Sequence, residues 1–114
     1  MPLTERQRTH VERTLTEFCA ARVPAHLRDQ LRHGFRIAGN SVELYESRPA
    51  FRRPHKWQDL AVAKFRYVAS RNHWRLYCQY RDMKWHEYEP RPMARSFSVL
   101  LQEVIDDPTG IFWG

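Results

Sequence analysis

Alternating apolar and polar residues run through residues 61–89, and this pattern constrains the fold more than any other part of the sequence. A two-residue turn at Arg71-Asn72 would fold the segment into an antiparallel hairpin, since Asn tolerates the positive φ of tight hairpin turns. Residues that face each other across a hairpin lie on one side of the sheet, so the apolar residues would gather on a single face. The predicted pairs are Ala69 with Trp74, Tyr67 with Leu76, Phe65 with Cys78 and Ala63 with Tyr80.

The opposite face of this predicted hairpin is polar and mostly basic. Its residues are Lys64, Arg66, Arg75, Tyr77, Gln79 and Arg81. A third strand over residues 84–88 would return beside the second and pair Tyr77 with Tyr88. This register puts Tyr88 on the basic face and Glu87 on the apolar face. Glu87 is therefore expected at a bulge, or as a buried or rim carboxylate.

The N-terminal segment predicts a helix. Thr4 and Gln7 fit a capping box, apolar residues recur at helical spacing after it, and Pro24 ends the helix. Residues 24–33 can form a short second helix. That helix is either a connector that tucks two leucines under the sheet or the reading helix of a winged-helix fold.

The clearest hairpin covers residues 35–47. With Gly39-Asn40 as its turn, Ile37 faces Val42 on one side of the sheet. Together with the three strands described above, the count is five. The predicted fold class is α+β, with an N-terminal helix, a five-stranded antiparallel meander and a C-terminal helix packed on one sheet face.

A last helix is predicted after the meander, capped by Ser96 or Ser98. Its apolar stripe is Phe97, Leu100, Leu101, Val104 and Ile105. Pro108 ends the helix, and the chain continues into the apolar residues 111–114. Such a terminus is expected to dock on the core rather than to hang free.

Length and composition are those of one domain spanning residues 1–114. With 42% hydrophobic and 13% aromatic residues the chain can build a single core. No apolar run approaches the roughly 20 residues of a membrane span, and no secretory leader is recognisable, so a cytoplasmic location is expected. Cys19 and Cys78 are expected to be reduced and to act as small hydrophobic side chains.

The net charge of the chain is +6, and Lys and Arg residues are densest in residues 48–57. The segment holds four Lys or Arg residues, two prolines and no acidic residue, and it carries Phe51 and Trp57. One interpretation is a solvated crossover between two hairpins. The other is a loop that contacts a polyanion, with cations on phosphates and aromatic rings on bases.

The basic sheet face and this segment together favour a non-enzymatic domain that binds a polyanion, chiefly nucleic acid. Tyrosines on the face could stack on unpaired bases, which favours single strands or RNA over reading of a duplex groove. The predicted contact residues are Arg36, Arg48, Arg52, Arg53, Lys56, Lys64, Arg66, Arg75, Tyr77, Arg81 and Tyr88, with Tyr45 on the same face. Glu43 and Glu46 would weaken the positive field.

Two other classes of function stay open. Exposed Tyr and Trp residues also suit a protein-interaction module or a homodimer. A metal-dependent enzyme such as a nuclease would use His86 and Glu87 as ligands, or Glu43 or Asp59 together with Lys64. The sequence contains no Gly-rich phosphate loop, nucleophile elbow or paired-cysteine motif, so no catalytic residue, cofactor or metal is predicted.

Four segments carry a resemblance to a known family. They are VPAHLRDQLRHGFRI, GNSVELYESRP, KWHEYEP and the terminal DPTGIFWG. In order and spacing the chain resembles, over roughly residues 12–114, a family of small bacterial proteins known as domain of unknown function three-zero-two-four. The resemblance implies a single bacterial domain and supplies no activity, cofactor or catalytic residue.

Overall fold

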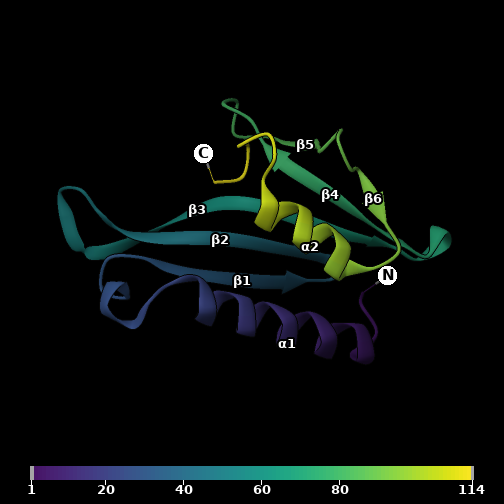
Figure 1. The fold of residues 1–114 in the computed structure, drawn as a ribbon, viewed down its shortest axis with the longest axis horizontal. Coiled ribbons are helices and arrows are strands. Elements are labelled where there is room, and N and C mark those ends of the chain that lie inside the picture. Colours follow the sequence, from purple (N-terminus) through teal and green to yellow (C-terminus); the bar gives the residue numbers. More distant parts are fainter. Residues whose placement is uncertain (1, 114) are drawn as a thin grey trace.

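The structure is a computed structural model that describes residues 2–113, apart from the side chain of Pro54. In chain order the elements are α1 (Glu5–Arg22), the 3-10 turn η1 (Ala25–Leu27), β1 (Arg32–Ala38), β2 (Ser41–Ala50), β3 (Arg53–Val68), the 3-10 turn η2 (Ala69–Arg71), β4 (His73–Gln79), β5 (Trp85–Glu87), β6 (Met93–Ala94) and α2 (Phe97–Asp106). The sheet has the order β1-β2-β3-β4-β5, all pairs are antiparallel, and β6 also pairs with β4 (Figure 1). The predicted α+β fold is confirmed, with one short strand more than expected. No helix among the described residues is long and apolar enough to cross a membrane.

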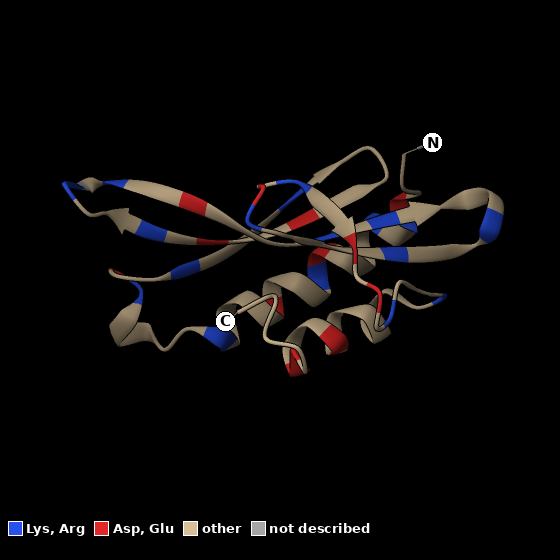
Figure 2. Cartoon of the chain, turned by 90° about the horizontal axis from the view of Figure 1, so that it is seen from above, with Lys and Arg blue, Asp and Glu red and all other residues tan. Residues whose placement is uncertain are grey.

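One face of the sheet carries the core, and both helices lie on that face (Figure 1 and Figure 2). Phe65 and Leu76 of the sheet, Leu15 of α1 and Leu100 of α2 have no exposed surface. Full burial of a side chain of this size contributes about 1.5–3 kcal/mol. The face predicted to be apolar is therefore the covered one, and the basic face is open to solvent.

The first hairpin has the predicted register, with Ile37 opposite Val42. The hairpin of β3 and β4 does not, because Phe65 pairs with Leu76 instead of Cys78. Its turn is longer than the two residues predicted, since η2 forms a turn of 3-10 helix that ends at Asn72 with φ 49°. The correction is a shift of two residues, which leaves every side chain on its predicted face because the side-chain period of a strand is two.

Strand β5 pairs with β4 one residue away from the predicted register. Glu87, rather than Tyr88, lies opposite Tyr77. A one-residue shift exchanges the two faces. Glu87 is consequently exposed on the open face, and no bulge or buried carboxylate is needed there. Tyr88 is in the core, 2% exposed, and its hydroxyl donates a hydrogen bond to Glu103 at 3.1 Å.

Residues 48–57 are not a crossover between hairpins, which corrects the first interpretation of this segment. Strands β2 and β3 continue past the core and pair with each other up to Ala50 and Arg53, with Phe51 and Arg52 as the turn. Irregular registers at Leu44/Tyr45 and Pro49/Ala50 interrupt the ladder, as bulges do. We call residues 48–57 the arm, and Figure 1 shows it projecting past the ends of both helices.

The connection between α1 and the sheet is short and irregular. Thr4 and Gln7 form the predicted capping box, and Val23 follows the last turn of α1 as its C-cap. The predicted short second helix is only η1, three residues long, and strand β1 already begins at Arg32. This segment is therefore a connector, and it holds no reading helix of a winged-helix fold.

The chain after α2 is docked, as predicted for its apolar residues. Asp107, at φ 42°, accepts hydrogen bonds from the backbone N–H groups of Phe112 at 3.1 Å and Trp113 at 2.9 Å. The indole Nε1 of Trp113 donates to the carbonyl of Val104 at 2.8 Å. Phe112 is buried, whereas Ile111 remains exposed, and Gly114 lies outside the described residues.

Candidate functional site

Five of the eleven residues predicted to contact a polyanion lie together on the open face of the sheet. The register places Arg36 beside Glu43, Glu43 beside Lys64, and Lys64 beside Tyr77 across neighbouring strands. Arg66 lies directly opposite Arg75 in the next pair. Strand pairing thus gathers, on one surface, side chains that are up to about 40 residues apart in the sequence.

Two of these arginines are paired with carboxylates on the same face. Arg36 Nη2 lies 2.9 Å from Asp59 Oδ2, and Asp59 also accepts a hydrogen bond from Ser47. Arg75 pairs with Glu87, the residue that the shifted register of β5 brings onto this face. Exposed pairs of this kind contribute only about 0–1 kcal/mol of stability, but each neutralises one cation of the predicted surface.

The tyrosines of the open face are covered by arginines. The Cζ atom of Arg36 lies 4.6 Å from the centroid of the Tyr45 ring, and that of Arg66 lies 5.7 Å from the Tyr77 ring. A cation over the ring face is favourable in itself. These rings are therefore less free to stack on bases than the sequence suggested. Lys64 and Arg66, two cations of this face, form no ion pair among the described residues.

Sequence reasoning missed one stacked pair at the base of the arm. The Cζ atom of Arg32 lies 3.9 Å from the ring centroid of Trp57, although the two residues belong to different hairpins. Arg32 begins β1, and Trp57 lies opposite Pro49 across the arm. No local pattern in the sequence signals this contact, because it depends on how far β2 and β3 extend together.

The arm is basic in composition, with four Lys or Arg residues and no acidic residue. Arg48 pairs with Glu46 at 2.6 Å, but Arg52, Arg53 and Lys56 are exposed and form no ion pair among residues 2–113. Phe51 at the tip is 95% exposed. Three unneutralised cations and a free aromatic ring therefore occur within six consecutive residues.

Arg81 does not join this surface in the way the sequence suggested. It lies in the turn between β4 and β5, which Figure 1 shows far from the arm. Tyr88 does not join it either, because its side chain is buried under the tail. Of the predicted contact residues, the structure thus groups those of the arm and those of β1, β3 and β4.

His86 and Glu87, considered as metal ligands, lie on opposite faces of the sheet, whereas Glu43 and Lys64 are cross-strand neighbours on the open face. His86 Nε2 lies 2.8 Å from Asp82 Oδ2 and its ring stacks on Tyr80, whereas Glu87 pairs with Arg75 on the opposite face. A backbone hydrogen bond from Lys84, followed by that from His86, lowers the pKa of Asp82. Among the described residues no three His, Cys, Asp or Glu side chains group as metal ligands do.

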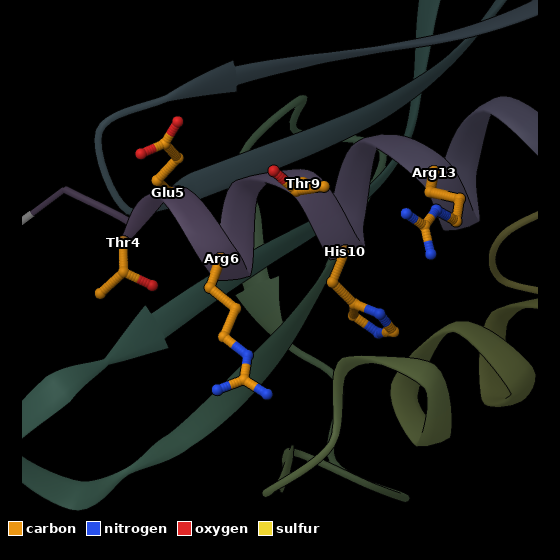
Figure 3. A pocket seen from close by; sticks show the side chains of 6 residues that line it. All are labelled: Thr4, Glu5, Arg6, Thr9, His10 and Arg13. Atoms are coloured by element: carbon orange, nitrogen blue, oxygen red, sulfur yellow. The ribbon is translucent and has the colours of Figure 1, made fainter.

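A surface hollow of about 770 Å³ runs along the first turns of α1. Its six lining residues all come from this one helix or its cap, and Figure 3 shows their side chains spread along it without meeting at a common point. A smaller hollow of about 280 Å³ brings Arg6 and His10 of α1 close to Arg95 before α2. Sequence reasoning had no signal for that second group, because its members lie far apart in the chain.

A partly buried histidine, His33, lies where α1, β1 and the tail meet. The ring of His33 packs edge-on against Trp113 at 5.1 Å, and its Nδ1 atom is buried with no hydrogen-bond partner among the described residues. Burial lowers the pKa of His33, the nearby charge of Glu46 opposes this, and the charges of Arg22 and Arg48 reinforce it. The neutral ring is therefore the form that the folded protein favours.

We expect the protein to become less stable below about pH 6.5, and His33→Gln to lose part of this dependence. Folding lowers the pKa of His33 from 6.5, so the unfolded chain binds the proton first as the pH falls. The contribution of neutral His33 to the stability of the fold is thus complete above pH 6.5 and is lost as the pH falls below that value. Urea unfolding at about pH 7.5 and pH 5.5 measures the effect. His10→Gln, at an exposed position on α1, is the control, and an equal pH dependence in His33→Gln and the wild type would contradict the prediction.

Comparison with known proteins identifies the chain by family alone. The family described as Domain of unknown function (DUF3024) matches residues 3–114. Neither the search of curated proteins nor that of solved structures gives a match.

Proposed function

The chain belongs to the DUF3024 family, whose function is unknown, and from its own residues we propose that it is a non-enzymatic domain that binds nucleic acid. The observation that carries this proposal is the arm. Its free cations stand on a paired hairpin that projects from the domain, and residues 48–58 contain no acidic residue. A projecting basic hairpin can follow a phosphate backbone without the main body of the protein obstructing it.

The open sheet face supports the arm as a secondary contact. Lys64 and Arg66 on β3 are free of ion pairs among the described residues, and β3 is the strand that continues into the arm. Arg36 and Arg75 contribute less, since Asp59 and Glu87 neutralise them. The proposed path of the ligand therefore begins at the tip of the arm and continues along β3.

Titration of labelled single-stranded DNA and RNA at two salt concentrations tests the proposal. Binding is expected to weaken as salt rises, because neutralising each phosphate releases a counterion. Replacing both Arg52 and Arg53 with alanine should reduce the slope of log K against log salt by about 1.4, at about 0.7 per phosphate contact on a single strand. The change should leave the melting temperature unaltered, since both side chains are exposed.

A matched control removes the same charge elsewhere. Arg8 and Arg13 lie exposed on α1, on the covered side of the sheet, and changing both to alanine also removes two positive charges. This variant should keep the wild-type salt slope. If it flattens the slope as much as the arm variant does, net charge rather than the arm governs binding. Absence of binding to either strand at low salt would reject the proposed function.

A further inference from the structure

Phe51, at the tip of the arm, is more exposed than any other Phe, Tyr or Trp residue that the structure describes. Phe51 is 95% exposed, whereas the next most exposed aromatic residue among residues 2–113, Tyr80, is 44% exposed and stacks on His86. On the open face, arginines cover the rings of Tyr45 and Tyr77. Phe51 is thus the aromatic ring whose faces are left available.

The position of Phe51 is set by the pairing of the two strands beneath it. Ala50 and Arg53 are the last paired residues of β2 and β3, so the two residues between them form the end of the hairpin. The molecule is elongated, with extents of 45 × 30 × 23 Å, and the arm forms one end of it (Figure 1). The ring cannot reach the core from there, and it is held in water beside Arg52.

We propose that Phe51 stacks on an unpaired base of the bound nucleic acid while Arg52 and Arg53 contact the flanking phosphates. This inference rests on the proposed function and names its ligand class, a strand with exposed bases. Charge complementarity selects a polyanion, because the three free cations nearest the ring have no acidic neighbour in the arm. The ring of Phe51 adds a contact to the bases, which the phosphate contacts do not provide. Every base presents a flat face on which an aromatic side chain can stack.

The ligand therefore needs bases as well as phosphates. Bases inside a duplex are already stacked on their neighbours, so their faces are not open to Phe51. Single strands, loops and frayed ends present free base faces. Stacking of this kind is tolerant of sequence, and the arm is expected to distinguish paired from unpaired strands more than one sequence from another.

Two labelled strands of equal charge test the inference in the full-length protein. One is a single-stranded oligonucleotide of about 12 nucleotides, within the range that single-strand-binding surfaces cover, and the other has the same backbone with abasic sites throughout. The wild type should bind the base-bearing strand more tightly. Phe51→Ala should weaken that binding by about 5- to 150-fold and leave binding of the abasic strand unaffected. Phe51→Trp should restore the preference.

Each contrary result has a definite meaning. Equal affinity of the wild type for the two strands would overturn the stacking role, and so would an equal loss on both strands in Phe51→Ala. If Arg52 and Arg53 still determine the salt slope in either case, the proposed function stands without this inference. Phe51-dependent binding to vesicles of phosphatidylserine and phosphatidylcholine, without a preference for base-bearing strands, would also overturn the stacking role. The tip of the arm would then be assigned to a lipid surface.

Discussion

Trp74→Ala is expected to lower the free energy of unfolding by about 3–5 kcal/mol. The indole is 5% exposed and lies between two other aromatic rings, with centroids 5.3 Å from Tyr67 and 5.1 Å from Phe97. Because Phe97 begins α2, the substitution leaves a cavity where that helix meets the sheet. Since small domains are typically stable by about 5–15 kcal/mol, such a loss removes a large part of the total.

Urea unfolding followed by circular dichroism measures this change. Trp85→Ala is the matched control, because it removes the same side chain from a partly exposed position on the open face. The control is expected to cost clearly less than the Trp74 variant. A loss below about 1 kcal/mol for Trp74→Ala would mean that the ring does not fix α2 on the sheet.

The composition of the two sheet faces could be predicted from sequence because alternation fixes the side of each residue once a strand exists. Register could be predicted only where the turn was identified correctly, as at Gly39-Asn40 in the first hairpin, because the turn sets which residues pair. The 3-10 turn that ends at Asn72 shifts the pairing of β3 with β4 by two residues, and each side chain stays on its predicted face. The turn after Tyr80 contains Met83 at φ 63° and shifted the next pair by one, which exchanged Glu87 and Tyr88. The expected burial of Glu87 was the sign that this register was wrong.

The arm illustrates why the site was only partly predictable. Two prolines and a run of cations favour a loop by local preference, yet the pairing of β2 with β3 extends through Pro49. The cations of the arm were visible in the sequence. The isolation of Arg52, Arg53 and Lys56 from carboxylates was not visible, because Asp59 lies only three residues beyond Lys56 and pairs in the folded chain with Arg36 and Ser47 instead.

Deleting residues 111–114 is expected to destabilise the protein by about 3–5 kcal/mol, because it removes one buried and one partly buried aromatic side chain. Phe112 is 7% exposed and packs on Tyr88 at a centroid distance of 4.9 Å. Trp113 adds the hydrogen bond to Val104, and Arg22 of α1 lies 4.3 Å from its ring centroid. The tail therefore joins α1, α2 and the sheet.

Thermal and urea unfolding of the truncated chain measure this loss, with Ile111→Ala as the control. Ile111 belongs to the same segment but is 38% exposed, so its change should cost about 1 kcal/mol or less. Far-ultraviolet circular dichroism should stay close to that of the wild type at low temperature, since residues 111–113 form no helix or strand. An unchanged melting temperature after truncation would show that the tail contributes nothing to the fold, and its aromatic residues would then be available to a binding partner.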